Sequence, residues 1–280
     1  IEKDLRLGIS LVSDNYYTHP KFHFNKKAAY AFATRFYLMK GEWQSVIEYA
    51  DYVLGSEPKS QLRSWRHYAD EMEFSPQNLY HRYMAADEPA NLLLTTTESR
   101  WARSVVNEKY GSTFNTIDKI FAQRGIEGGG DYAKMNFIGT YLFTSSPAPT
   151  TTGRYMAKSE QTGTKPRGIY VTNALFTVDE VLLNRMEAYA MLRNYDHAID
   201  DYLQYMQGKF GFMPSVERAV YTSTNSNRYN LYSPFYGMTL KQLAMVQLIL
   251  DFRQKEFFQE GLRWFDIRRF HIAVKRSSKS

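Results

Sequence analysis

Apolar residues recur three and four positions apart in two stretches of the chain, residues 22–56 and 177–208. This spacing places them on one face of a helix. The positions are Val46, Ile47, Ala50 and Val53 in the first stretch, and Ala198, Ile199, Tyr202 and Met206 in the second. A segment rich in small residues precedes each helix, and an aromatic residue, Trp43 or Tyr195, opens it. Each stretch is typical of a tetratricopeptide-like helix pair; an ordinary pair of antiparallel helices is the alternative.

A third helical unit is expected over residues 239–270. Thr239 precedes Gln242 by three residues, and Thr177 precedes Glu180 in the same way, which is the spacing of a capping box. Positions at helical spacing then follow: Leu243, Val246, Leu250, Phe257 and Gly261. The pattern therefore predicts one long helix after Thr239.

The segments between these units, about 57–170 and 211–238, have the composition of loops. Glycines fill positions 128–130, prolines and threonines gather at 145–153, and Ser, Thr, Asn and Tyr alternate over 221–237. Short strands are expected at 91–95 and 168–171. We therefore predict one mainly α domain over residues 1–280, built from tetratricopeptide-like helix pairs in an α–α superhelix, with long irregular loops and minor β structure.

Composition excludes several classes of site. The chain has 280 residues and no cysteine, which rules out disulfides, zinc–thiolate sites, iron–sulfur clusters and a cysteine nucleophile. The six histidines are scattered, so neither a metal nor a cofactor is expected. Lys and Arg exceed Asp and Glu by 35 to 29. Much of that surplus lies in residues 266–280, which argues against a nucleic-acid-binding surface.

Neither a membrane-spanning segment nor a leader is visible in the sequence. No apolar run approaches the roughly 20 residues needed to cross a bilayer. Ile1 opens the chain without an initiator methionine or a lipidation motif. We therefore expect the chain to be a fragment of a longer precursor.

The most specific segment is the charged and aromatic end of the last helical unit. Its charges alternate in sign at helical spacing, along one face where they can pair in series: Arg253, Glu256, Glu260 and Arg263. Phe257, Phe258, Trp264 and Phe265 interleave with them, so the charges are expected to be enclosed and Trp264 to lie in the core. We interpret this segment, with Asp266 and Arg268, as a structural clasp, and a catalytic role for the two glutamates is not favoured.

The same segment resembles the C-terminal motif of the SusD/RagB family, which ends Glu-Gly-x-Arg-Trp-Phe-Asp-Leu-Arg-Arg. The matching residues are Asp251, Arg253, Glu256, Glu260, Gly261, Arg263, Trp264, Phe265, Asp266, Arg268 and Arg269. Phe252 departs from the motif, which usually has Glu there. The similarity extends to 22–54, with its Gly-Glu-Trp turn at 41–43, and to 177–202.

The resemblance implies a fold and a role. The family consists of surface lipoproteins of Bacteroidetes that bind nutrients, mostly glycans and sometimes peptides, without catalysis. They cover a SusC-like TonB-dependent transporter at the extracellular face of the outer membrane. By this resemblance the expected ligand is an oligosaccharide or polysaccharide, and membrane attachment would depend on a lipid anchor that is absent from this chain.

The aromatic content, 16% of residues, suits sugar binding, because rings stack on sugar faces while polar side chains meet the hydroxyl groups. The candidate rings lie in the loops: Trp65, Trp101, Tyr132, Tyr155, Tyr229 and Tyr232. Their candidate polar neighbours are Asp131, Arg154, Asn227 and Asn230. The loop over residues 128–155 is favoured, because its glycines allow close approach.

Two other functions stay open at this point. A glycoside hydrolase needs two carboxyl groups roughly 5–10 Å apart, and Glu127 and Asp131 are the available pair, although three glycines separate them. A peptide-binding or protein-interaction scaffold is the other alternative, because helical repeats often bind peptides.

Overall fold

The computed structural model describes residues 1–70, 81–98, 120, 142–144, 154–156, 163–165, 168–214 and 237–274. The chain divides into two compact units that interleave along the sequence. Unit 1 contains residues 1–64, 82–97 and 172–213, and unit 2 contains residues 65–81, 98–171 and 214–280. The described residues are mainly helical, as predicted.

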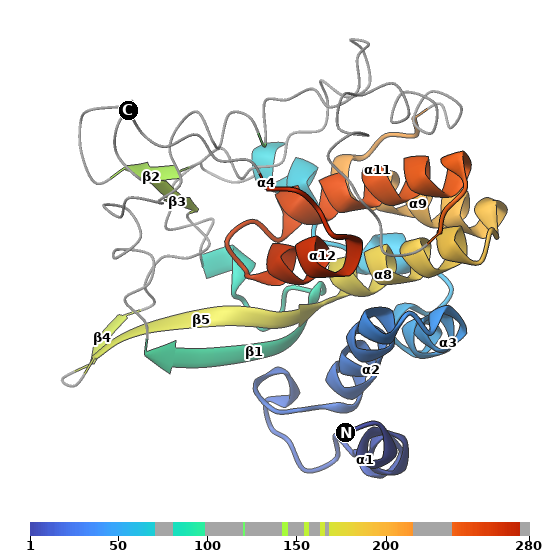
Figure 1. Ribbon diagram of the computed structural model, residues 1–280. Helices are drawn as coiled ribbons and strands as arrows, with labels where there is room; N and C mark the ends of the chain where they lie inside the picture. The colour runs from blue at the N-terminus through green and yellow to red at the C-terminus, as the bar shows by residue number, and fades with distance from the viewer. Residues whose placement is uncertain are drawn as a thin grey trace. The chain divides into compact units, whose positions relative to one another are not determined.

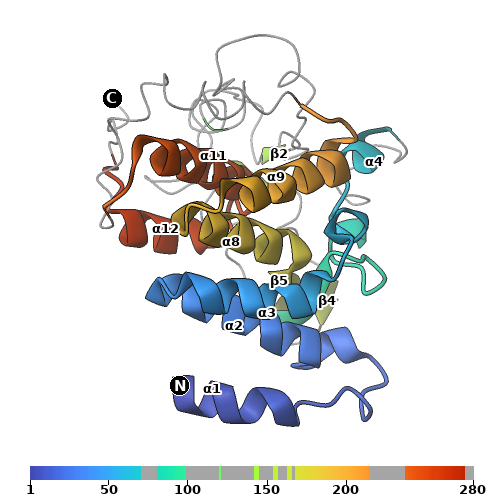
Figure 2. The same ribbon diagram turned by 90° about the vertical axis from the view of Figure 1, so that its right-hand side faces the viewer.

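Unit 1 is built around two helix pairs. The first is α2 (Lys26–Lys40) with α3 (Trp43–Leu54), and the second is α8 (Val178–Met191) with α9 (Tyr195–Phe210). Helix α8 packs against α3 as well as α9, so the four helices form a continuous layer (Figure 2). The two helix pairs expected from the hydrophobic spacing are therefore present and stacked on each other.

Shorter helices complete unit 1. Helix α1 (Glu2–Gly8) continues into the 3-10 turn η1 (Ile9–Leu11), and a second turn, η2 (Pro20–Phe22), precedes α2. The turn η3 (Pro58–Gln61) follows α3 and packs against α9.

Local sequence signals set the ends of the paired helices. Oδ1 of Asn25 accepts a hydrogen bond from the backbone N–H of Ala28 and so caps the start of α2. Gly41 ends the same helix with φ of 74°, a left-handed conformation that glycine adopts without steric cost. Thr177 caps α8 by accepting from the N–H of Glu180. The carboxylate of Glu180 does not reach back to complete the predicted capping box; it accepts hydrogen bonds from Arg35 at 2.7 and 2.5 Å instead.

Small residues lie at the interface between the helix pairs. Ala29 and Ala33 of α2 and Ala188 of α8 belong to one buried cluster with Tyr37 and Val46. Because alanine side chains are short, the helix axes approach closely and the larger rings fill the spaces beside them. Helix α8 is buried on almost every side, since α2, α3 and α9 all pack against it.

A sheet leads into the second helix pair. Strand β1 (Asn91–Glu98) pairs with β5 (Gly168–Thr177), and β4 (Gly163–Lys165) pairs with the beginning of β5 in antiparallel register. Both predicted strands are present and longer than expected. Within unit 1, the hydroxyl groups of Thr96 and Thr172 lie 2.9 Å apart, and β5 runs directly into α8 (Figure 1).

Unit 2 contains α4 (Trp65–Asp70), α11 (Leu240–Glu256) and α12 (Leu262–Phe270), and a hairpin of β2 (Leu142–Thr144) with β3 (Arg154–Met156). Helix α11 begins with the predicted capping box: the side chain of Gln242 accepts from the N–H of Thr239, and the Thr239 hydroxyl accepts from the N–H of Gln242.

A long helix begins after Thr239, as predicted, but its expected continuation through Phe257 and Gly261 is wrong. Helix α11 ends at Glu256, and the backbone of Gln259 and Gly261 then takes positive φ angles of 64° and 82°. A right-handed helix cannot continue through such residues. The chain therefore turns, and α12 lies alongside α11 (Figure 1). Within the described parts of the chain, none of the helices has the length and apolarity needed to span a membrane.

Candidate functional site

Most of the predicted ligand residues lie outside the described residues: Trp101, Asp131, Tyr132, Asn227, Tyr229, Asn230 and Tyr232. Glu127, the other half of the glycosidase pair, lies outside them as well. Arg154 and Tyr155 fall in β3, where they stand opposite Thr144 and Phe143 of β2. The ligand-binding role of all these residues stays a prediction.

The interpretation of Trp65 as a ring exposed in a ligand loop is wrong. Trp65 begins α4, is only 3% exposed, and donates from its indole Nε1 to Oε2 of Glu256 over 2.9 Å. A buried ring cannot stack on a sugar, because both of its faces are covered by protein. The hydrogen bond of Trp65 therefore links α4 to the end of α11.

The centre of the clasp is a buried ion pair across the turn between α11 and α12. Nε of Arg253 lies 3.1 and 3.0 Å from the two carboxylate oxygens of Asp266, and both residues are 1% exposed. Arg269 adds a second guanidinium, with Nη2 at 2.8 Å from Oδ1 of Asp266. Pairing in series along one helix, as predicted, is wrong, because the turn separates the charged residues onto two elements.

Burial by itself raises the pKa of Asp266, whereas the positive charges of Arg253 and Arg269 and their hydrogen bonds lower it. The lowering prevails, so the pKa of this carboxyl group is below its ordinary value. Asp266 is therefore ionised at neutral pH and holds the two arginines against each other's repulsion.

The outer residues of the clasp segment have more varied surroundings. Glu260 and Arg263 are half-buried, and Nη1 of Arg263 lies 3.4 Å from the carbonyl oxygen of Leu250. Arg268 is exposed, and Trp264 is 61% exposed. The expectation of a core position for Trp264 is wrong, because the buried face of α12 consists of other residues: Leu262, Asp266, Arg269 and Phe270.

A second buried arginine, which the sequence analysis missed, joins the helices of unit 1. Arg185 of α8 donates to both carboxylate oxygens of Asp201 on α9, at 3.0 and 2.6 Å, and to Asp51 of α3 at 2.6 Å. Burial raises the pKa of Asp201 despite this arginine. Burial lowers the pKa of Arg185, but the two carboxylates outweigh it and the net shift is upward.

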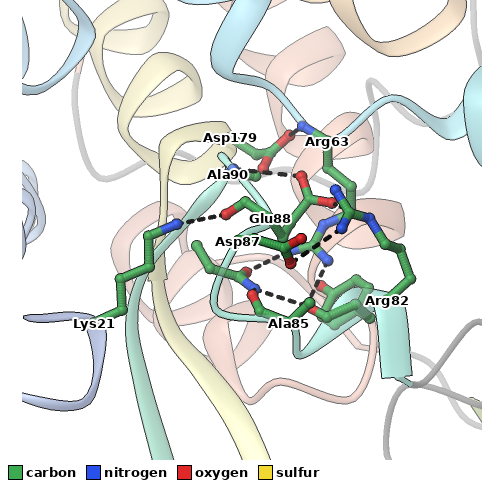
Figure 3. Close-up of polar contacts among 10 residues, drawn as sticks. Lys21, Arg63, Arg82, Ala85, Asp87, Glu88, Ala90 and Asp179 are labelled. Atoms are coloured by element: carbon green, nitrogen blue, oxygen red, sulfur yellow. Dashed lines mark hydrogen bonds and ion pairs between the residues drawn. The ribbon is translucent and has the colours of Figure 1, made fainter. Parts of the chain in front are cut away.

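A third network surrounds Arg63, just after η3 (Figure 3). Arg63 is fully buried and donates to the carbonyl oxygen of Tyr83 at 2.9 Å and to Oδ1 of Asn91 at 2.7 Å. Its backbone N–H donates to Asp179, which also pairs with the buried Lys209 of α9. Within unit 1 this network fixes the segment before β1 against the start of α8.

The same segment anchors the loop that precedes α2. Nζ of Lys21 donates to the carbonyl oxygen of Glu88 over 2.7 Å, and burial lowers the pKa of Lys21 (Figure 3). The carboxylate of Glu88 in turn pairs with Arg82 at 3.3 Å. The side chain of Lys21 thus attaches the loop over residues 13–24 to the segment that precedes β1.

This loop, called here the aromatic loop (residues 13–24), was not among the sequence-predicted ligand segments. Tyr16 is 89% exposed, Phe22 46% and Phe24 45%. Tyr17 and His23 stack with their ring centroids 4.4 Å apart and their planes within 5°. The density of rings over residues 16–24 is visible in the sequence, but this segment lies outside the long stretches between helical units in which ligand residues were expected.

Several buried carboxylates among the described residues form ion pairs within the scaffold. No group of three metal-ligating side chains occurs among the described residues. The buried carboxylates Asp179, Glu180, Asp201 and Asp266 each contact a lysine or an arginine. These four buried carboxylates therefore stabilise the helical scaffold through their ion pairs.

Comparison with known proteins begins with the first helices. Residues 1–38 match a family model, SusD-like_3, described as "Starch-binding associating with outer membrane". A comparison with curated protein sequences finds no match.

Several solved structures share the fold over nearly the whole chain. A SusD superfamily protein from Bacteroides thetaiotaomicron is 16% identical in sequence and superposes with a TM-score of 0.60. The matched region covers 99% of this chain and 56% of the length of that protein. A protein described as sugar-binding, from Bacteroides vulgatus, is 19% identical with a TM-score of 0.57, covering 99% of this chain and 55% of its own.

A SusD-like carbohydrate-binding protein from the same species is 15% identical with a TM-score of 0.53, covering 95% of this chain and 50% of its own. The chain thus spans about half the length of these structures. This chain therefore shares the fold of these SusD-like structures.

Proposed function

We propose that this chain is part of a non-catalytic glycan-binding protein. It acts at the extracellular face of the outer membrane and delivers its ligand to a SusC-like TonB-dependent transporter. The observation that carries the proposal is the SusD-like fold together with the match of residues 1–38 to a family described as starch-binding. Two structures of the same fold are described as a carbohydrate-binding and a sugar-binding protein.

The chemistry of the described residues supports binding more than catalysis. Hydrolysis of a glycoside needs one carboxyl group that donates a proton and a second that attacks or activates water. Asp266 is held ionised between two arginines, and Glu256 accepts from the indole of Trp65. These acids are committed to the scaffold, whereas the rings of Tyr16, Phe22 and Phe24 face solvent.

Native gel electrophoresis of the complete protein in gels containing amylopectin, xylan, inulin or mannan tests the proposal. Binding retards migration in at least one of these gels relative to a gel without polysaccharide. The same protein, incubated with the retained glycan, releases no new reducing ends. Retardation by none of the four, or release of reducing ends, would overturn the proposal.

The transporter part of the proposal has its own test. Co-purification from detergent-solubilised outer membranes, with an affinity tag on this protein, recovers a TonB-dependent transporter in near-equal amount. Recovery of the tagged protein alone, at detergent concentrations that preserve other outer-membrane complexes, would contradict delivery to a transporter. Glycan binding would be untouched by that result.

A further inference from the structure

The aromatic loop combines a fixed backbone with exposed rings. Asn25, only 4% exposed, donates from Nδ2 to the carbonyl oxygens of Pro20 at 3.0 Å and Leu92 at 2.8 Å. The same side chain caps α2 through its Oδ1. One buried amide therefore fixes the loop to the helix that follows it and to strand β1.

Two further contacts fix the beginning and the middle of the loop. Oδ1 of Asp14 accepts from the backbone N–H of Lys26 over 2.7 Å, and Lys21 reaches back to the carbonyl oxygen of Glu88. The stacked rings of Tyr17 and His23 close the loop on itself. Because these contacts fix the backbone of the loop, less conformational entropy is lost when a ligand binds to it.

The large rings of Tyr16, Phe22 and Phe24 are wholly or partly exposed to solvent, although the ring of Phe24 also packs edge-on against Phe32 of α2, with the centroids 6.3 Å apart. Tyr16, Phe22 and Phe24 together expose apolar surface at a cost, since burying a large side chain is worth roughly 1.5–3 kcal/mol. Asn15, Thr18 and His19 lie beside them in the loop and are exposed as well. Rings among amide, hydroxyl and imidazole groups are the combination that recognises a sugar: its C–H faces stack on the rings and its hydroxyl groups meet the polar atoms.

We propose that the aromatic loop is a carbohydrate-contacting surface, in which Tyr16, Phe22 and Phe24 stack on pyranose or furanose rings of the bound glycan. This inference rests on the glycan binding proposed above and assigns part of it to unit 1. The loop also lies within the segment that matches the starch-binding family model, residues 1–38. It is distinct from the loops over 57–170 and 211–238 that the sequence analysis favoured.

The test uses the complete protein and whichever of amylopectin, xylan, inulin or mannan retards the wild type. A triple variant, Tyr16→Ala with Phe22→Ala and Phe24→Ala, is expected to bind that polysaccharide at least tenfold more weakly. Because Phe22 and Phe24 are about half buried and Phe24 packs against Phe32, its thermal unfolding temperature is expected to fall by a few degrees, and circular dichroism checks that the variant is still folded at the assay temperature. The matched control is Tyr52→Ala, which removes another exposed tyrosine, on α3 and outside the loop, and leaves the affinity unchanged.

A second pair of variants separates stacking from general apolar contact. Tyr16→Phe keeps the ring and retains most of the affinity, whereas Tyr16→Leu keeps apolar surface without a ring and loses it. Equal affinity of the wild type and the triple variant overturns the role of the loop and leaves glycan binding standing. If the wild type binds none of the four polysaccharides, the proposed function itself fails. An equal loss in Tyr52→Ala would also overturn the assignment to the loop.

Discussion

The indole Nε1 of Trp65 donates a hydrogen bond to Oε2 of Glu256 over 2.9 Å, although the two residues are 191 positions apart in the sequence. Both side chains are buried. The contact links α4 to the last turn of α11 inside unit 2, and it gives a buried glutamate a hydrogen-bond donor. Long-range contacts of this kind cannot be derived from helical spacing.

Trp65→Phe tests this contact. The ring still fills most of its space, but a carboxylate oxygen of Glu256 loses a donor in a buried position. We expect a loss of about 1–3 kcal/mol in the free energy of unfolding, measured by urea titration. Trp264→Phe is the matched control: Trp264 is 61% exposed, so its replacement changes stability by no more than about 0.5 kcal/mol. Equal losses in the two variants would contradict this account of Trp65.

Asp266→Asn tests the centre of the clasp. The variant leaves Arg253 and Arg269 buried side by side without the carboxylate between them. Removal of one partner from a buried ion pair costs about 3–5 kcal/mol, which urea unfolding would show as a lower midpoint with the same slope. Arg268→Ala changes an exposed arginine of the same helix and should stay within about 0.5 kcal/mol of the wild type. A stable Asp266→Asn protein would show that the ion pair does not hold α12 on α11.

The same aspartate predicts a dependence of stability on pH. The pKa of Asp266 is lower in the folded chain than its ordinary value of 3.8, so the unfolded chain binds the proton more tightly. This contribution is complete above the ordinary value and is lost as the pH falls through the folded-state pKa. Urea midpoints measured from about pH 7 to about pH 3 should therefore fall more steeply in the wild type than in Asp266→Asn. Parallel curves would refute the prediction.

Arg185→Met removes the guanidinium that joins α8 to α9 and α3. Asp201 is then left buried without that cation, and we expect a loss of about 3–5 kcal/mol in the free energy of unfolding. Asp51→Ala removes the outer partner, which is 56% exposed, and should cost about 1 kcal/mol or less. Adding Asp201→Leu to Arg185→Met should restore part of the loss, because no buried charge is then left behind. Failure of the double variant to recover any stability would argue against this explanation.

Two helical glycines provide a test of packing. An added Cβ at Gly208 of α9 would lie 2.6 Å from the carbonyl oxygen of Lys59 and 2.8 Å from a methyl carbon of Leu62. Gly208→Ala must therefore displace η3 and should cost about 1–3 kcal/mol by thermal or urea unfolding. At Gly8 of α1 a Cβ meets nothing within 4 Å, so Gly8→Ala should be neutral or stabilising by up to about 1 kcal/mol. The reverse order of the two effects would contradict the packing described here.

Local features of the fold could be predicted from the sequence because they depend on neighbouring residues. The spacing of Val46, Ile47 and Ala50 located α3, and Thr239 with Gln242 located the start of α11. The end of α11 could not be predicted in this way, because Gly261 fits the helical period while its backbone adopts φ of 82°. The spacing of apolar residues does not show where the chain turns out of a helix.

The candidate site was less accessible to sequence reasoning, because it depends on contacts between distant residues. Arg253 and Glu256 were correctly chosen as enclosed charges, yet their neighbours in space, Asp266 and Trp65, come from elsewhere in the chain. Whether a tryptophan stacks on ligand or lies in the core is likewise decided by packing. Trp65 was therefore predicted to contact ligand but is buried, and Trp264 was predicted to lie in the core but is exposed.

The support of the aromatic loop has a consequence for how this protein can vary. Its backbone is held by Asn25, by Asp14 and by Lys21, and none of these contacts uses the rings of Tyr16, Phe22 or Phe24. Tyr16 and Phe22 can therefore mutate while these backbone contacts persist, whereas the ring of Phe24 also packs against Phe32. Selection can therefore change the chemistry of this exposed surface in single steps while the scaffold beneath it is retained.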